Sequence, residues 1–477
     1  MKRAAVAAAV VAALAVPVAA SAFSPNDPLA PRQWYLDKDR AFSAFDALPP
    51  LPPVRVAVLD SGVELNHPEL KGRILDARTF VGGSPADADG HGTFVAGEIA
   101  AATDNGLGIA GLAPSARLLV AKIVRDDGSI SPKAEARAIR WAVNDGARVI
   151  NLSLGGTRDP LDSSVDGFSY SEQRAIRFAV RHGALVVASV GNGDHAPATP
   201  WPFASYPAAL PHVLGVGAYG KNGDVPLFSN RDDVFVDLAA PGQDMLSLFP
   251  RALTGKNPSC SEQGYSSCGP KEYRHADGTS FSAPQVTAAA AMMLALRPEL
   301  RPDQVSNLLE RTADDATPAN GCVSCTIGRD GLTGFGRLDV AAAIHALHAP
   351  LPPADHLEPN DDTGPFAAAV YRHGFATSAT LDTWDDPTDV YRVPLERGQR
   401  LVVRVPGSGA DVSLALWKPA VTSLALARTS LRAARSVHPA GAPERISYRA
   451  RAAGWYYIQV KLAKPGFGAY TIRISRS

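Results

Sequence analysis

The hydrophobic positions between residues 54 and 219 form short, nearly continuous runs. Five runs rich in Val, Leu and Ile cover 54–60, 117–122, 148–152, 184–190 and 213–218. Helical patterns lie among them at 132–144 and 171–182, and two more follow at 280–297 and 302–312. Buried runs that alternate with helices are typical of a parallel sheet covered on both faces. We therefore predict an α/β fold with a doubly wound, mostly parallel sheet.

Beyond residue 350 the hydrophobic pattern changes to a period of two. Strands are expected at 390–393, 401–405, 412–417, 455–460 and 470–474, separated by Gly, Pro and Asp turns. Such short alternating strands are typical of a small all-β sandwich. The predicted parts are an N-terminal segment over 23–53, the α/β domain over 54–349, a linker over 350–357 and the β-sandwich over 358–477.

The first residues have the layout of a secretory signal peptide. Lys2 and Arg3 precede an apolar stretch over residues 4–18, and Ala20-Ser21-Ala22 is a small-x-small cleavage site. We predict a signal peptide over residues 1–22 and an extracellular or periplasmic protein. An uncleaved membrane anchor is the alternative, but the stretch is short for a bilayer span.

Composition excludes some classes of partner. The chain has 477 residues, 46% of them hydrophobic and 20% charged, with a formal net charge of +0. These values are typical of a globular protein and give no electrostatic reason to bind nucleic acid. We expect no nucleic-acid partner, no membrane association after signal cleavage, and a monomer.

The four cysteines are expected to form disulfides in an exported protein. Cys260 and Cys268 lie in one Gly/Ser-rich stretch, and Cys322 and Cys325 lie in another. Four cysteines allow three pairings, and loop closure favours the two local ones. Zinc is the alternative for Cys322 and Cys325, but the other pair lacks a matching spacing.

Three polar residues lie where the predicted fold would place reactive side chains beside a ligand crevice. Asp60 ends the first strand, and the carboxyl ends of parallel strands face the ligand crevice. His91 lies between two glycines at the start of a helical pattern, and Ser280 lies at the entry of an apolar helix. Each has a structural explanation if taken alone, as a turn former or a helix cap. Together they supply a nucleophile, a base and a carboxylate that orients the base.

An amide lies at a fourth strand end. Gly191-Asn192-Gly193 follows the run at 184–190, and an amide donor flanked by glycines suits an oxyanion hole. A plain turn is the alternative explanation for this segment.

These segments resemble the subtilisin-like serine protease (subtilase) family, whose triad runs in the order Asp, His, Ser. Residues 58–62, 91–97 and 278–284 resemble its three motifs, and 153–156 resembles its substrate-binding strand. The resemblance covers roughly residues 26–347. The chain departs from the family at Phe94, where a second histidine is commonest, and at Phe281-Ser282-Ala283, where Met-Ala-Ser is commoner.

The resemblance implies a secreted serine endopeptidase acting on proteins or peptides, with Asp60, His91 and Ser280 as catalytic residues. Asn192 and the backbone N–H of Ser280 would form the oxyanion hole. The residues expected to bind substrate are Ser153, Leu154, Gly155, Ser189, Val190 and Gly191. Asn26-Asp27-Pro28 and Gln33-Trp34 resemble the mature enzyme's own N-terminal segment. No cofactor is expected for the chemistry, although structural calcium is frequent in the family.

The tail resembles the bacterial pre-peptidase C-terminal domain. The similar segments are 358–362, 389–391, 398–399 and 454–457. Such domains often follow secreted proteases. An acidic group, Asp382, Asp385, Asp386 and Asp389, is a candidate calcium site, although solvated turn carboxylates are the more common explanation of such a group.

Two other functions compete with an endopeptidase. A binding or adhesion protein with a catalytically silent protease fold is one, but all four catalytic positions are filled. An esterase or amidase for small substrates is the other, and the strand for extended peptides disfavours it.

Overall fold

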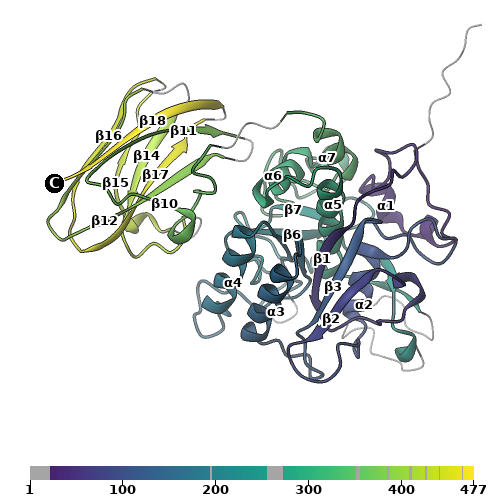
Figure 1. Cartoon of the computed structure of the whole chain (residues 1–477). Coiled ribbons are helices and arrows are strands. Elements are labelled where there is room, and N and C mark those ends of the chain that lie inside the picture. The colour runs from purple at the N-terminus through teal and green to yellow at the C-terminus, as the bar shows by residue number, and fades with distance from the viewer. Residues whose placement is uncertain are drawn as a thin grey trace, which may run out of the picture.

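The computed structural model describes residues 22–193, 196–254, 272–350, 355–383, 386–407, 411–424, 427–439, 441–464 and 466–477. An α/β body and a β-sandwich lie side by side, joined by the chain that follows α7 (Figure 1). The predicted signal peptide lies outside the described residues, apart from Ala22. Among the helices of the described part, none is long and apolar enough to cross a membrane.

Seven parallel strands form the sheet of the α/β body, in the order β2-β3-β1-β4-β5-β6-β7. They are β1 (Val54–Asp60), β2 (Ile74–Thr79), β3 (Ala116–Lys122), β4 (Val149–Leu152), β5 (Leu185–Ser189), β6 (Val213–Tyr219) and β7 (Leu238–Pro241). The predicted doubly wound parallel sheet is confirmed. The hydrophobic pattern missed the two edge strands, β2, which is partly exposed, and β7, which has 4 residues and ends in a proline.

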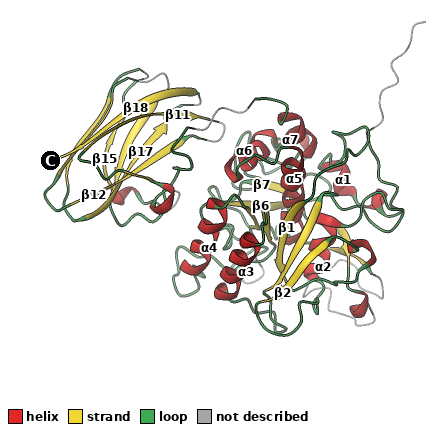
Figure 2. Ribbon diagram, in the orientation of Figure 1, coloured by secondary structure: helices red, strands yellow, loops and turns green. Residues whose placement is uncertain are grey.

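Helices cover both faces of this sheet (Figure 2). One face packs against α2 (His91–Ala100) and α5 (Ala283–Leu296), and the other packs against α3 (Pro132–Asn144) and α4 (Tyr170–Arg181). Every residue of α5 except Leu296 is buried, and its alanines let it approach the strands closely. The remaining helices are α1 (Trp34–Lys38), α6 (Pro302–Thr312) and α7 (Val340–Ala346).

The helix α5 begins three residues later than the pattern predicted. Thr279–Phe281 form a separate 3₁₀ turn, and Pro284 occupies the first turn of α5. Proline suits that position because its missing N–H needs no partner in a first helical turn. Ser280 therefore lies in a tight turn before the helix and not within it.

The N-terminal segment packs onto the α/β body. Tyr35 is 0% exposed and its hydroxyl donates to the carbonyl of Leu246 at 2.8 Å. Gln33 exchanges hydrogen bonds with the backbone of Ala110, and Arg40 forms an ion pair with Asp339 at 2.6 Å. Its aromatic side chains belong to the same hydrophobic core as α2 and α5.

The C-terminal part is a sandwich of two sheets, in the orders β10-β12-β17-β14-β15 and β11-β18-β13-β16. Apart from the short parallel β10–β12 pair, all pairs are antiparallel. The strands are β10 (Ala368–Ala369), β11 (Gly374–Asp382), β12 (Thr388–Leu395), β13 (Arg400–Val405), β14 (Val412–Trp417), β15 (Arg432–Ser436), β16 (Glu444–Arg449), β17 (Gly454–Leu462) and β18 (Phe467–Arg476). The predicted all-β module is confirmed, and its inward side chains form a core of their own.

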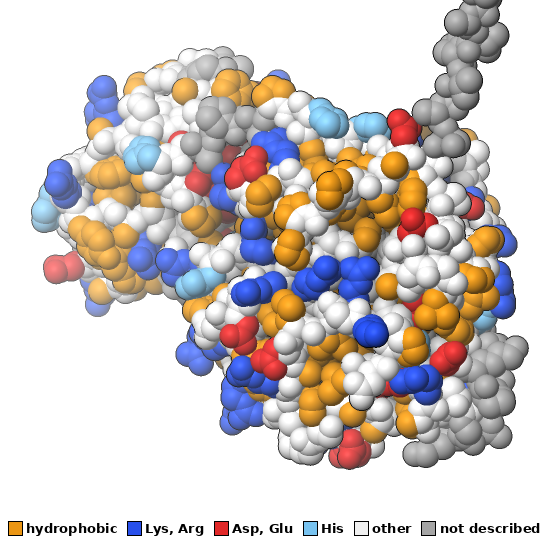
Figure 3. All heavy atoms as spheres, turned by 45° about the vertical axis from the view of Figure 1, so that its right-hand side comes forward, with side chains coloured by type: hydrophobic (Ala, Val, Ile, Leu, Met, Phe, Trp, Pro, Cys, Tyr) orange, Lys and Arg blue, Asp and Glu red, His pale blue; other side chains and the backbone are white. Residues whose placement is uncertain are grey.

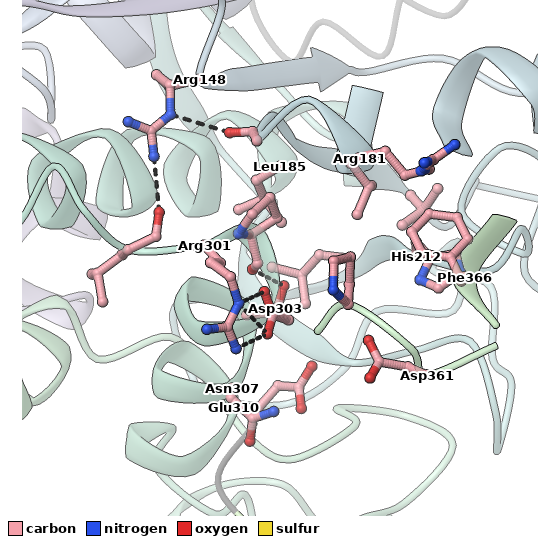
Figure 4. Close-up of a pocket in the computed structure, with 18 of the residues that line it drawn as sticks. Arg148, Arg181, Leu185, His212, Arg301, Asp303, Asn307, Glu310, Asp361 and Phe366 are labelled. Carbon is pink, nitrogen blue, oxygen red and sulfur yellow. Dashed lines mark hydrogen bonds and ion pairs between the residues drawn. The ribbon is translucent and has the colours of Figure 1, made fainter. Parts of the chain in front are cut away.

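The sandwich contacts the α/β body at the amino end of β6. His212, the residue before β6, stacks on Phe366 with ring centroids 4.2 Å apart, and its Nε2 lies 3.5 Å from Asp362. Arg177 of α4 lies 3.8 Å from the same carboxylate. A cavity of about 470 Å³ adjoins this contact, with Asp361 and Phe366 across from Arg301 and Glu310 (Figure 4).

The described cysteines form one disulfide, between Cys322 and Cys325, with Cα atoms 5.4 Å apart. This local pairing was predicted, and it leaves neither thiol for zinc. Cys260 and Cys268 lie outside the described residues. On the face shown in Figure 3, basic and acidic side chains are interspersed among hydrophobic ones, in line with the balanced net charge.

Candidate active site

Asp60 and His91 meet at the carboxyl edge of the sheet. Asp60 is the last residue of β1 and His91 is the first residue of α2. The Nδ1 of His91 lies 2.8 Å from Oδ1 of Asp60, a hydrogen-bond distance. Asp60 is only 2% exposed, and its Oδ1 also accepts from the N–H of Ser61 at 2.7 Å. The buried carboxylate therefore fixes the orientation of the imidazole.

A second carboxylate holds the two chain segments together. Asp87 accepts hydrogen bonds from the Ser61 hydroxyl at 2.9 Å and from the backbone N–H and hydroxyl of Thr93 at 2.9 and 2.6 Å. The Ser61 hydroxyl in turn accepts from the N–H of Gly92 at 2.9 Å. These bonds tie the residue after Asp60 to the first turn of α2.

The two glycines beside His91 are required by close packing. A Cβ on Gly92 would lie 2.1 Å from the carbonyl oxygen of Gly62. Gly90 has φ +115°, and a Cβ there would lie 2.4 Å from the ring of Phe249. Both distances are far below van der Waals contact, so these positions admit no side chain.

The protonation of His91 is set by two opposed influences. Burial is the largest single influence and lowers the pKa of His91, whereas the charge and the hydrogen bond of Asp60 raise it. Asp89 and Asp87 act in the same direction as Asp60, and the resulting pKa is about 9.

A chain of buried polar side chains supports the turn that carries Ser280. The Ser153 hydroxyl donates to the carbonyl of Ser280 at 2.6 Å and accepts from the Asn151 amide at 2.9 Å. The hydroxyl of Thr287, on α5, donates to Asn151 at 2.9 Å. The end of β4, the turn and α5 are thereby locked together around the serine.

Asn192 has its amide orientation fixed by the residue before Ser280. The backbone N–H and the hydroxyl of Thr279 both donate to Oδ1 of Asn192, at 2.9 and 2.8 Å. The Nδ2 group remains as a donor, and it lies 3.2 Å from the position that a Cβ on Gly278 would take. The amide therefore presents its N–H groups beside the turn of Ser280.

Ser280 and Asn192 line one cavity of about 160 Å³. Four other predicted site residues line it as well: Leu154, Gly155, Ser189 and Gly191. Trp201, Ser205 and Asn230, which the sequence did not single out, complete much of the wall. None of the described residues that line this cavity carries a charge.

Two predicted substrate-binding residues do not line the cavity. Val190 is 0% exposed and packs into the core beneath α3 and α4. Successive side chains along an extended chain point to opposite faces, so Val190 points away from the face of Ser189 and Gly191. Ser153 is 2% exposed and lies behind the Ser280 turn, where it supports the site indirectly.

Comparison with protein families matches residues 53–330 to the subtilase family, which is more than half of the 477 residues. The chain belongs to the subtilase family. Residues 387–462 match the bacterial pre-peptidase C-terminal domain, in the β-sandwich.

Three relatives of this subtilase are proteases of bacteria. It is 32% identical to thermitase of Thermoactinomyces vulgaris over 277 residues, 57% of this chain and 85% of thermitase. It is 33% identical to subtilisin Savinase of Lederbergia lenta over 294 residues, 61% of this chain and 90% of that enzyme. Identity to a cell wall-associated protease of Bacillus subtilis is 34% over 311 residues, which span only 31% of that longer protein.

Solved structures give the same picture of the subtilase fold. A protease from Pseudoalteromonas arctica superposes with a TM-score of 0.54 at 28% identity, covering 68% of this chain and 99% of that one. A lanthipeptide protease gives a TM-score of 0.54 at 26% identity, covering 69% of this chain and 99% of that one.

Phe94 and Phe281, each a departure from a family motif, contact each other in this subtilase. The rings of Phe94 and Phe281 have centroids 4.4 Å apart, and Phe281 also lies 5.3 Å from the ring of His91. Both phenylalanines are essentially unexposed. The departures therefore form one aromatic contact between α2 and the Ser280 turn.

Sequence analysis missed the residues that position the site, namely Asp87, Thr279 and Asn151. Each acts through hydrogen bonds to groups distant in sequence, so no periodic pattern marks it. The only available signal is that Thr279 directly precedes the nucleophile position, and that Asp87 lies four residues before His91.

An acidic cluster of this subtilase lies where its sandwich begins. Ligand oxygens of Asp355, Glu358, Asp386 and Asp389 all lie within 4.8 Å of one another. Of the predicted acidic group, Asp386 and Asp389 belong to the cluster, Asp382 does not, and Asp385 lies outside the described residues.

The cluster has the character of a cation site. Asp386 is 3% exposed and neither of its carboxylate oxygens has a hydrogen-bond partner. Asn360 is 0% exposed, and neither its side-chain oxygen nor its side-chain nitrogen has a hydrogen-bond partner with regular geometry. Its amide nevertheless lies close enough to Asp389 to lower the pKa of that carboxyl. Burial and neighbouring carboxylates raise the pKa of Asp389 to about 8. Oxygen ligands of this kind fit calcium.

Proposed function

We propose that this subtilase is a secreted serine endopeptidase. One observation carries the proposal: His91 is hydrogen-bonded to buried Asp60, while Ser280 and Asn192 line a single uncharged cavity at the same edge of the sheet. Acyl transfer through a serine requires a nucleophile, a base and a carboxylate that orients the base, and Phe281, the residue after Ser280, lies 5.3 Å from the ring of His91. The protease relatives support the same reaction class.

In this mechanism Ser280 attacks the peptide carbonyl carbon through Oγ. Neutral His91 takes the hydroxyl proton on Nε2 and then gives it to the departing amine, which leaves an acyl-enzyme on Ser280. A water molecule then attacks the ester, and His91 again accepts and returns the proton. Asp60 holds the Nδ1 tautomer and stabilises the imidazolium during both steps.

The developing oxyanion is bound by Nδ2 of Asn192 and by the backbone N–H of Ser280. Asn192 suits this role because Thr279 occupies its Oδ1 and leaves only donor groups available. A donor that is already oriented stabilises the transition state without the cost of reorganising.

Extended peptides bind along 153–155 by strand addition, and the adjoining cavity accepts the side chain before the scissile bond. An uncharged cavity of about 160 Å³ favours a neutral side chain at that position. Ser189 and Gly191 contribute to its wall, whereas Val190 supports it from the core.

The proposed location is extracellular or periplasmic. It is supported by the predicted signal peptide, by the Cys322–Cys325 disulfide and by the C-terminal domain, which is typical of secreted proteins. We further propose an N-terminal segment over 23–53, a peptidase domain over 54–349, a linker over 350–357 and a C-terminal domain over 358–477. The protein acts as a monomer, with protein or peptide substrates as its partners.

The test compares the exported chain with its Ser280→Ala variant on casein, with and without a covalent inhibitor of serine hydrolases. We expect the parent to cleave casein, the inhibitor to stop it, and the variant to be inactive. An Asn192→Leu variant should retain the fold and lose about 10²–10³ in kcat, a magnitude taken from subtilisin itself.

Two outcomes would contradict the proposal. A folded parent that is as inactive as Ser280→Ala would favour a binding protein with a silent protease fold. A parent that turns over short esters but leaves denatured casein intact would favour an esterase or amidase.

A structural calcium ion is the second proposal, supported by the buried Asp386, whose two carboxylate oxygens have no hydrogen-bond partner. Asp355, Glu358, Asp386 and Asp389 would hold the ion with their carboxylates, and the Asn360 carbonyl would join them. The ion would neutralise the buried charges and fix the start of the sandwich. No step of the peptidase reaction involves it.

A further inference from the structure

The loop at residues 157–169 continues directly from the proposed substrate strand. Ser153 contacts the turn of Ser280, whereas Leu154, Gly155 and Thr157 follow along the wall of the same cavity. The chain therefore leads away from the nucleophile and into the loop. A peptide extended along this strand must meet the loop on one side of its scissile bond.

The hydrogen bonds of the strand show which of its edges is free to pair with a peptide. Gly156 exchanges two backbone hydrogen bonds with Tyr206, at 2.8 and 2.9 Å. Neighbouring residues of a strand direct their N–H and C=O groups to opposite edges, so the groups of Gly155 face the other edge. An antiparallel peptide there places its first residue before the scissile bond opposite Ser153 and its third opposite Gly155, so the residues before these reach the loop.

The loop is an organised surface anchored beside this strand. The N–H of Gly167 donates to the carbonyl of Thr157 at 2.9 Å, which closes the loop at its base. Phe168 packs edge-on against Tyr206, with ring centroids 5.7 Å apart. Tyr206 thus holds both the strand and the loop, and the loop keeps a fixed place relative to the cavity.

The loop carries negative charge. It contains three aspartates, Asp159, Asp162 and Asp166, and one arginine, Arg158. Arg158 forms an ion pair with Asp232 at 2.7 Å, and its side chain is only 14% exposed. Hydrogen bonds from the side chain and backbone of Ser164 lower the pKa of Asp162, so this exposed group is ionised in neutral solution.

Exposed apolar side chains accompany the acids. Leu161 is 86% exposed and Val165 is 48% exposed, both within the loop, and Tyr170 directly beyond it is 68% exposed. The surface next to the strand therefore combines negative charge with apolar area. Its complement is a peptide segment that carries Lys or Arg, whose long aliphatic stems cover apolar surface while the charged ends reach the acids.

We infer that this loop selects substrates with a basic residue four to six positions before the scissile bond, an inference that rests on the proposed peptidase function. Asp162 and Asp166 act on the basic end, and Leu161 and Val165 contact its aliphatic stem. Charge complementarity and continuity with the cleft are the grounds for this assignment.

The test uses three fluorogenic peptides that share one cleavage site and differ only in the fifth residue before it, which is Lys, Ala or Glu. For the parent enzyme at low salt, kcat/KM should be about tenfold higher for the Lys peptide than for the Glu peptide. Screening at 0.5 M salt should reduce the ratio to about threefold or less. In the double variant Asp162→Asn/Asp166→Asn the ratio should fall close to one.

Glu299→Gln is the matched control, because it removes an exposed acid beside the interdomain cavity and should keep the parent's ratio. Cleavage of the Ala peptide together with equal rates for Lys and Glu would overturn the inference and leave the peptidase function intact. A double variant that keeps the parent's ratio would also overturn it. Failure of the parent to cleave any of the three peptides would overturn both.

Discussion

His91 illustrates how single residues set the working range of this site. Burial alone would favour the neutral imidazole, but Asp60 lies within hydrogen-bond distance and favours the charged form. Together with Asp89 and Asp87, Asp60 outweighs the effect of burial, so the pKa of His91 is raised from 6.5 to about 9. A base must be neutral to accept a proton, and this shift therefore moves activity toward alkaline pH.

The expected pH profile follows from the upward shift of the His91 pKa. Below about pH 9 the imidazole of His91 is protonated and unable to accept the Ser280 proton, so kcat/KM should fall about tenfold per pH unit on acidification. Kinetics on an uncharged peptide between pH 5 and 11 measure this directly. Asp60→Asn removes the charge that raises the pKa, so its residual activity should have a more acidic midpoint. A parent profile that is flat from pH 5 to 9 would refute the role of His91.

Two elements, α2 and the turn before α5, bring the proposed catalytic residues together through one aromatic contact. Phe94 lies on the buried face of α2 and Phe281 follows Ser280 in the turn, with ring centroids 4.4 Å apart. Phe281 also packs against the ring of His91. The contact therefore contributes both to the core and to the placement of the catalytic base and nucleophile.

Removal of either aromatic ring from this contact should lower the stability of the protein. Phe94→Ala should lower the free energy of unfolding by about 3–5 kcal/mol, because it leaves a cavity between the two elements. Guanidinium unfolding of the Ser280→Ala background avoids self-digestion during the measurement. A double-mutant cycle with Phe94→Leu and Phe281→Leu should give a coupling of about 0.5–1.5 kcal/mol.

Leu227→Ala provides the comparison, since Leu227 is 67% exposed and its removal should change stability by less than about 0.5 kcal/mol. Additive effects of the two Leu substitutions would show that the rings of Phe94 and Phe281 do not act as a pair.

At the scale of the whole molecule, the peptidase site and the C-terminal domain occupy opposite edges of one sheet. Asp60, Ser189 and the Ser280 turn lie at the carboxyl edge, whereas His212 meets the sandwich just before the amino end of β6. The sandwich therefore leaves the catalytic cavity open. Its attachment passes through Asp355 and Glu358, which also belong to the acidic cluster.

Calcium should stabilise this attachment without taking part in catalysis. If the ion binds the folded cluster alone, a concentration 100 times its Kd adds about 2.7 kcal/mol to the stability of the C-terminal domain. Scanning calorimetry of the Ser280→Ala chain, with calcium or with a chelator, should show the corresponding rise and fall in Tm. Asp386→Asn should abolish the response.

Asp411→Asn is a suitable control, because Asp411 is a mostly buried acid of the same sandwich that pairs with Lys464 and does not belong to the cluster. A calcium response that survives in Asp386→Asn would place the ion elsewhere. The rate at which a serine-directed inhibitor labels the parent should be the same with calcium and with a chelator.

The sequence alone was enough to predict both fold classes and to single out the four residues proposed for catalysis. Continuous apolar runs specify strands buried on both faces, and alternation specifies the sandwich, because both patterns follow from the local geometry of the chain. Asp60 and Asn192 were identifiable because they end or follow such runs. His91 and Ser280 were identifiable because the family motifs are local too.

Only the tertiary structure decided which distant groups meet. Thr279 orients Asn192 across 87 positions of sequence, and Asp355 and Glu358 join Asp386 and Asp389 in place of Asp382. Phe94 contacts Phe281, and His212 lies beside Asp362. Such contacts leave no periodic trace, because each depends on how whole elements pack and not on the conformation of neighbouring residues.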